Sequence, residues 1–231
     1  MKKIIKITLA IFFAPAVVFA FKELALAAAR AALSSGAAAV FTIGLIAYIP
    51  VHFFIFKFSR VYVLEHEVTH AITALFFGYK VKSITVNKSS GNVRLDDYNE
   101  AVVLAPYIVP LYFLLFAFAA ALLIYFGFDG EWYRYGYSFI LGFLLCFHFV
   151  HTVKTLTEAK QPDLKMAGGA VFSLVCVAFF NILFVFIFLA LVQPESVSLT
   201  AVFKDTFINT LKLWEKVINY IVYLVIEIFK L

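Results

Sequence analysis

The stretch VYVLEHEVTHAITALFFGY, residues 61–79, carries the pentapeptide HEVTH at residues 66–70 inside a segment apolar enough to be a membrane helix. Residues four apart share one face of a helix, so His66 and His70 can bind the same metal ion. Glu67 then lies within reach of a water molecule bound to that metal. Ionisable groups are costly in hydrocarbon and by default indicate a functional site. The motif therefore predicts a metal centre, and a pair of structural histidines beside a glutamate is the alternative.

The composition predicts an integral membrane protein in contact with a lipid bilayer. Of the 231 residues, 64% are hydrophobic, 19% aromatic and 14% charged, whereas a soluble domain is about half apolar and a quarter charged. The net charge of +5 is small and scattered, with no basic run beyond Lys2, Lys3 and Lys6, so we expect no nucleic-acid partner. Cys146 and Cys176 lie in apolar stretches and indicate neither a disulfide framework nor a Cys-rich metal site.

The order of apolar stretches predicts an all-α polytopic membrane protein with about six transmembrane helices. We expect an amino-terminal anchor and interfacial helix over residues 1–35, a membrane core over 36–192, and an amphipathic or transmembrane carboxy-terminal helix over 193–231. For the first apolar segment, a cleavable signal peptide is the alternative to an anchor. The apolar and motif-bearing helices expected before the carboxy-terminal one are residues 7–21, 36–56, 61–79, 101–126, 136–153 and 167–192.

Two segments have a different character. Residues 80–95 alternate around a turn-like centre and predict a small membrane-associated β-hairpin, whose backbone must be paired within protein or line a wet cavity. From Asp205 onward, polar residues three and four apart form one stripe along a helix. That stripe predicts either an interfacial helix or a last span with its stripe packed inward, and a headgroup-facing stripe is the commoner outcome.

The basic residues indicate an orientation only in part. If the spans alternate, the lysines and arginine of the hairpin and the lysines of residues 154–165 fall on one side, which the positive-inside rule places in the cytoplasm. The amino-terminal lysines then fall on the other side, unless the first apolar segment is cleaved, re-entrant or interfacial.

A catalytic zinc site usually has three protein ligands and one water, so the two histidines need a third partner. Asp163 follows Pro162 at the mouth of a helical hairpin, where the next helix amino terminus favours an anion; an ordinary helix cap is its alternative. The other candidates are His148, His151 and Glu100.

The motif helix ending at Gly78, the strand through Val81 and the hairpin glycine Gly91 together resemble the core of the site-2 protease family of intramembrane zinc metallopeptidases. The stretch NEAVVLAPYIVPLY, residues 99–112, resembles a compact prokaryotic branch of that family. The resemblance covers about residues 40–190. It implies an enzyme of a prokaryotic cell membrane whose substrates are membrane proteins or peptides.

The resemblance also implies a site: one zinc ion held by His66, His70 and Asp163, with Glu67 as the catalytic base. This chain lacks the family's usual third-ligand motif, an Asn and Pro ahead of Leu-Asp-Gly, and the QPDL of residues 161–164 matches it only in part. A histidine of the 136–153 segment therefore stays open as a replacement or support for Asp163.

The expected function is zinc-dependent hydrolysis of peptide bonds in membrane proteins. A zinc-activated water attacks the scissile carbonyl, while Glu67 takes its proton and later delivers it to the leaving amine. The hairpin either pairs with extended substrate backbone or is a structural plug. Two other classes remain as alternatives: a non-proteolytic membrane scaffold with a structural zinc, which needs four protein ligands, and a transporter-like protein with a proton relay. The sequence favours no particular oligomeric state.

Overall fold

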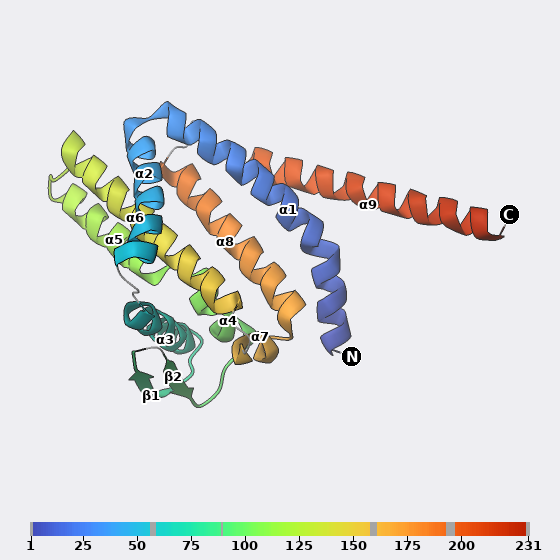
Figure 1. The fold of residues 1–231 in the computed structure, drawn as a ribbon, viewed down its shortest axis with the longest axis horizontal. Coiled ribbons are helices and arrows are strands. Elements are labelled where there is room, and N and C mark those ends of the chain that lie inside the picture. Colours follow the sequence, from blue (N-terminus) through green and yellow to red (C-terminus); the bar gives the residue numbers. More distant parts are fainter. Residues whose placement is uncertain (1, 56–58, 89, 158–160, 193–196, 230–231) are drawn as a thin grey trace.

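The computed structural model of the protein describes residues 2–55, 59–88, 90–157, 161–192 and 197–229 (Figure 1). These residues form helices and one two-stranded antiparallel sheet. In chain order the elements are α1 (Lys2–Ser34), α2 (Gly36–Pro50) with a π-helical turn (Val51–Ile55), α3 (Ser59–Phe76), β1 (Val81–Val86), β2 (Gly91–Leu95), α4 (Glu100–Ile108), α5 (Leu111–Tyr125), α6 (Glu131–Thr157), α7 (Pro162–Met166), α8 (Ala170–Val192) and α9 (Leu199–Phe229).

Four helices in the described residues are long and apolar enough to cross a membrane: α1, α2 with its π-helical turn, α6 and α8. A fifth span results if α4 and α5, which meet at an angle of 67°, are counted as one. The polytopic helical architecture with a small hairpin agrees with the prediction, but the count of about six spans is not confirmed. The motif helix α3 is not among the candidates, because its 18 residues include Arg60, Glu65 and Glu67.

Residues 1–35 differ from their predicted division into an anchor and a separate interfacial helix. From residue 2 to residue 34 they form the single helix α1, which continues through Pro15. The helix ends before Ser35, whose side chain accepts a hydrogen bond from Ala38 N and caps α2. Alanines on α1 pack into one core with α8, so α1 is an integral part of the bundle. The buried residues of this core are Ala20, Ala27, Ala31, Ile182, Phe186, Leu189 and Val197.

The other helices pair closely. A Cβ at Gly44 of α2 would lie 2.1 Å from the carbonyl oxygen of Phe139 on α6, so only glycine permits this approach of the two backbones. Between α4 and α5 the chain bends at Pro110, inside the 101–126 segment where prolines predict a kink. Helix α6 begins at Glu131, earlier than predicted, and α9 covers the predicted carboxy-terminal stripe.

The hairpin is confirmed, with β1 antiparallel to β2 and Val86 opposite Gly91. In Figure 1 the hairpin, α3, α4 and α7 gather at one end of the bundle, and the amino terminus of α1 points to the same end. Lys6 accordingly contacts Glu100 Oε1 at 2.7 Å and the carbonyl oxygen of Ala167 at 3.0 Å. The amino terminus of α1 and the basic hairpin thus lie at the same end, the arrangement expected if α1 and α2 cross the membrane and α3 does not.

Candidate metal centre

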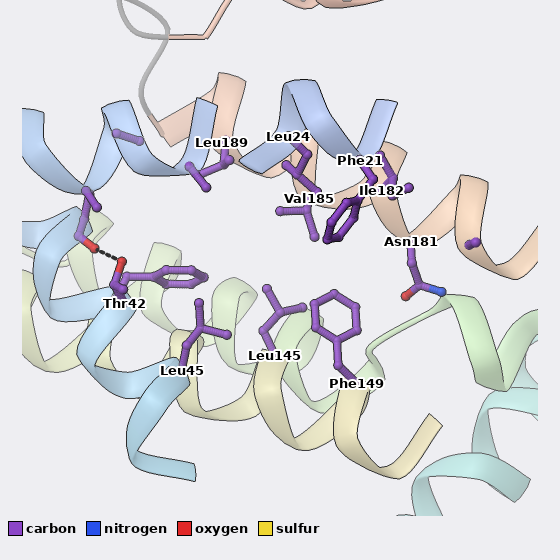
Figure 2. Close-up of a pocket in the computed structure, with 16 residues that line it drawn as sticks. Phe21, Leu24, Thr42, Leu45, Leu145, Phe149, Asn181, Ile182, Val185 and Leu189 are labelled. Atoms are coloured by element: carbon purple, nitrogen blue, oxygen red, sulfur yellow. Dashed lines mark hydrogen bonds between the residues drawn. The ribbon is translucent and has the colours of Figure 1, made fainter. Parts of the chain in front are cut away.

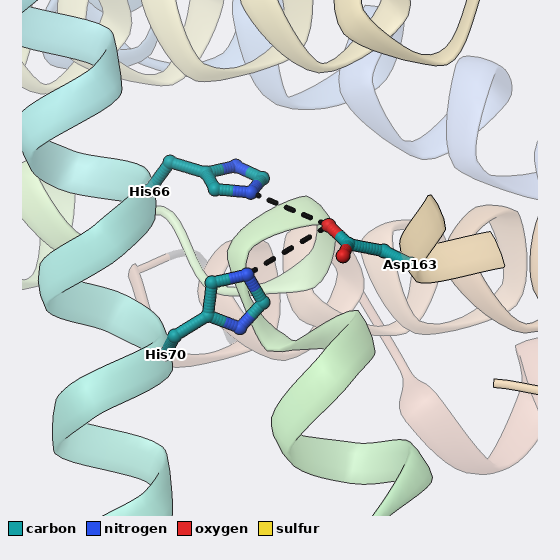
Figure 3. A group of neighbouring side chains, drawn as sticks. All are labelled: His66, His70 and Asp163. Carbon is teal, nitrogen blue, oxygen red and sulfur yellow. Dashed lines mark ion pairs between the residues drawn. The ribbon is translucent and has the colours of Figure 1, made fainter. Parts of the chain in front are cut away.

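Three side chains from two segments far apart in sequence come together on one side of α3: His66 and His70 of α3 itself, and Asp163 of α7. Asp163 Oδ2 lies 3.6 Å from His66 Nε2 and 3.7 Å from His70 Nε2 (Figure 3). The ligand atoms of the three residues all lie within 4.8 Å of one another. Around a tetrahedral zinc ion with bonds near 2.0–2.1 Å, neighbouring ligand atoms are about 3.4 Å apart. The two separations from Asp163 are within a few tenths of an ångström of this spacing, and the ligand types are those of a zinc site, so the group could hold a zinc ion once its members draw closer together.

The second nitrogen of each imidazole is also occupied. His70 Nδ1 lies 2.8 Å from the carbonyl oxygen of Val102, and because a carbonyl only accepts, this nitrogen is the donor and Nε2 keeps its lone pair. His66 Nδ1 lies 3.4 Å from the hydroxyl of Tyr62, one turn earlier on α3. Such hydrogen bonds orient metal ligands and select their tautomer. Both rings consequently present Nε2 toward Asp163.

The helix α4 supplies the acceptor for His70. Asn99 caps α4 by accepting a hydrogen bond from Val102 N at 2.9 Å. This cap fixes the first turn of α4, whose Val102 carbonyl faces His70. The stretch 99–112 thus contributes a backbone carbonyl to the site, while Glu100 pairs with Lys6 and lies outside the ligand group.

Asp163 is held by Tyr107 of α4. The Tyr107 hydroxyl donates to Asp163 Oδ2 at 2.8 Å, and Asn181 of α8 donates to the Tyr107 carbonyl oxygen at 2.7 Å. Burial alone would raise the pKa of the Asp163 carboxyl, but the two nearby imidazoles and the hydrogen bond from Tyr107 outweigh it and hold this pKa below its usual value. The lowered pKa keeps the carboxylate ionised, and the hydrogen bond from Tyr107 helps to hold it beside the two histidines.

The two buried glutamates of α3 contact different parts of the protein. Glu67, the neighbour of His66 in the chain, is 7% exposed, and its side chain lies against Gly91 of β2. Glu65 is 3% exposed, and its Oε1 accepts a hydrogen bond from Tyr112 N at 3.2 Å. That backbone group belongs to the first turn of α5, where amides have no acceptor within the helix. Glu65 therefore stabilises the bend between α4 and α5.

The other predicted ligand candidates lie elsewhere. His148 is fully buried in α6, and His151 Nε2 contacts the Tyr48 hydroxyl at 3.0 Å while its ring stacks on Tyr62 at 4.8 Å. Glu100 pairs with Lys6. Within the part of the chain that the structure describes, none of these joins the ligand group. His151 instead supports Tyr62, the residue that contacts His66.

Sequence reasoning missed the residues that orient the ligands. Tyr62 precedes His66 by four residues on the same helix, so the i, i+4 spacing was a usable signal. Tyr107 and Asn181 carried no local signal, because their roles depend on the packing of α4 against α7 and α8.

A cavity of about 390 Å³ lies between α1, α2, α6 and α8 (Figure 2). Its wall is almost entirely apolar, and Asn181 stands at one end. The cavity is lined by none of the three residues of the candidate metal centre. Asn181 connects the two regions through its bond to Tyr107.

Comparisons of the chain with protein-family models, with curated proteins and with solved structures find no match. The interpretation of the site therefore depends on its own geometry and chemistry.

Proposed function

We propose that this protein is an intramembrane zinc metallopeptidase of the site-2 protease type, which hydrolyses peptide bonds of membrane-protein substrates. The observation that carries the proposal is the position of Asp163 against Nε2 of both motif histidines. Two segments far apart in sequence supply three ligands of the types that catalytic zinc sites use. The fourth position of a tetrahedral ion would then be available to water or substrate.

Each residue of the site would have a separate task in this reaction. Zinc, when bound to His66, His70 and Asp163, would polarise the scissile carbonyl and lower the pKa of a water molecule. Glu67, one position after His66 on α3, would take a proton from that water and later donate it to the leaving amine. Its low exposure keeps bulk water away from the carboxylate, which strengthens its electrostatic interactions.

The hairpin is the proposed contact for the substrate. A transmembrane substrate must be unwound before its peptide bonds can be attacked, and an open strand edge can pair with extended backbone. The central residues of β1 are exposed, and both strands lie beside α3. These positions are compatible with substrate pairing close to Glu67.

The alternatives make different demands on the site. A structural zinc is closed by four protein ligands, whereas the described residues supply the three-membered group only. A proton relay has one specific observation in its favour, since the Tyr48 hydroxyl contacts His52 Nδ1 at 3.2 Å and His151 Nε2 at 3.0 Å. The relay contacts lie outside the group formed by His66, His70 and Asp163, so a relay would leave that group without a role. We therefore propose the peptidase first.

The test combines metal analysis with a cleavage assay on a library of membrane peptides. His66→Ala and His70→Ala should each abolish stoichiometric zinc binding, whereas Glu67→Gln should keep the zinc and lose turnover by about 100-fold or more. The purified wild-type protein should contain one zinc per chain. Full turnover in the Glu67→Gln variant would refute the mechanism, and zinc retained without cleavage in the wild type would favour the scaffold.

A further inference from the structure

Gly91 and Glu67 occupy the same small space. Gly91 is the first residue of β2, opposite Val86 of β1. A Cβ placed on Gly91 would lie 2.4 Å from Glu67 Cγ, 2.5 Å from Oε1 and 2.7 Å from Cδ. Real Cβ atoms essentially never approach other heavy atoms closer than 3.0 Å. The side chain of Glu67 therefore fills the position that any other residue at 91 would need.

The backbone conformation does not explain a glycine here. The glycines with positive φ are Gly78, Gly127, Gly168 and Gly169, and Gly91 is not one of them. An alanine at 91 would therefore adopt the local backbone without strain. The contact with Glu67 is the reason that the position is sensitive.

The contact also differs in kind from that of Gly44. A Cβ at Gly44 would meet the backbone of α6, which cannot move without separating two helices. At Gly91 the three nearest atoms all belong to one side chain, from Cγ outward, and a side chain can change rotamer without moving a helix or a strand. A substitution at Gly91 is thus predicted to move Glu67 and to leave the rest of the fold in place.

We propose that Gly91 is a positioning residue. Because residue 91 has no side chain, the Glu67 side chain can occupy the adjacent space, and this position keeps its carboxylate in place for the reaction at the proposed zinc site. The proposal depends on the proposed role of Glu67 as base. To restore an ordinary contact, Glu67 must move by roughly 1 Å, and a misplacement of that size can cost about 100-fold in rate. The hairpin, which lies beside α3, thereby takes part in catalysis through its backbone position as well as through any contact with substrate.

The test compares Gly91→Ala with a glycine whose replacement meets nothing. Gly136 in α6 is exposed, and a Cβ there has no neighbour within 4 Å, so Gly136→Ala is the matched control. In Gly91→Ala we expect kcat to fall about 10- to 100-fold, with KM, zinc content and melting temperature unchanged. In the Glu67→Gln background, adding Gly91→Ala should cause no further loss, because the displaced group is already inactive.

A second measurement does not depend on turnover. A structure of the zinc-bound Gly91→Ala protein should have Glu67 in a new rotamer and the β2 backbone in its original place. Wild-type turnover, loss of zinc or of stability, or an unmoved Glu67 with a shifted hairpin would each overturn the proposal. Full turnover in Glu67→Gln would refute the base instead, and the rotamer of Glu67 would still decide whether Gly91 controls its position.

Discussion

Helices α3 and α9 have similar sequences in one respect and opposite fates in the structure. Both carry charged side chains among apolar ones, and neither is among the candidate membrane spans. On α3 the acidic groups are buried, with Glu65 3% and Glu67 7% exposed. On α9 the charged side chains of Lys212, Lys216 and Glu227 are exposed.

The difference lies in what surrounds each helix. The helix α3 is covered by the hairpin, by α4 and by the start of α5, and α7 brings Asp163 to its histidines. The helix α9 packs on α1, where Trp214 stacks on Phe12 and donates to its carbonyl oxygen, and its carboxy-terminal half extends away from the bundle (Figure 1). Polar residues in an apolar helix thus indicate a face that differs from the rest of the helix. The elements packed against the helix determine whether that face is buried in a site or exposed.

The largest expected effect concerns Asp163, which α7 places beside the histidines of α3. Asp163→Ala should remove most of the bound zinc, because it deletes a ligand. Glu100→Ala and His151→Ala should retain zinc near the wild-type level, since these residues lie outside the ligand group. Zinc per protein, measured for all three variants, gives the ranking. An empty site in His151→Ala together with a full one in Asp163→Ala would break the assignment.

A smaller effect is expected from the residue that orients the ligand. Tyr107→Phe removes the hydroxyl that donates to Asp163 and should weaken zinc affinity about 10- to 100-fold. Tyr112→Phe is the control, because that hydroxyl donates to the carbonyl oxygen of Val61, away from the ligands. Competition with a chelator of known affinity measures both. Equal affinity in the two variants would mean that Asp163 needs no support from α4.

A smaller effect still is expected from substitutions in the hairpin, which should change substrate binding. Proline cannot donate a ladder hydrogen bond, and neighbouring residues of β1 direct their amides to opposite edges. Among prolines placed singly at Ser83, Ile84 and Thr85, those on the free edge should raise KM for helical membrane substrates roughly 2- to 10-fold, the equivalent of one lost hydrogen bond. Alanine at the same positions is the control. Three folded, zinc-bound proline variants with wild-type cleavage would make the hairpin a structural plug.

The smallest effect is expected on α9. Lys216→Ala changes an exposed side chain, so the free energy of unfolding should change by no more than about 0.5 kcal/mol, with zinc content and turnover unaffected. Thermal unfolding in detergent and metal analysis measure both quantities. A loss of zinc in this variant would contradict the contrast between the two helices, since it would make the stripe of α9 part of the site.

The sequence predicted much of the local structure. Spacing placed the motif on a helix, alternation predicted the hairpin, and the prolines of 101–126 marked the region where α4 and α5 meet at 67°. The predicted count of about six spans is not confirmed: the described residues offer four or five candidates, and α3, with its three charged residues, is not among them. The helix expected over residues 136–153 is longer in the structure, where α6 begins at Glu131.

By itself the sequence determined that this is a helical membrane protein with two histidines and a glutamate on neighbouring positions of one helix, because periodicity and composition are local properties of the chain. Only the tertiary structure brought Asp163, and none of its rivals, next to the two histidines, placed Tyr107 and Val102 behind these side chains, and brought Gly91 against Glu67. These relations join segments that are distant in sequence, and they depend on how α4, α7 and the hairpin pack around α3. No local pattern encodes a distance of a few ångströms between such segments.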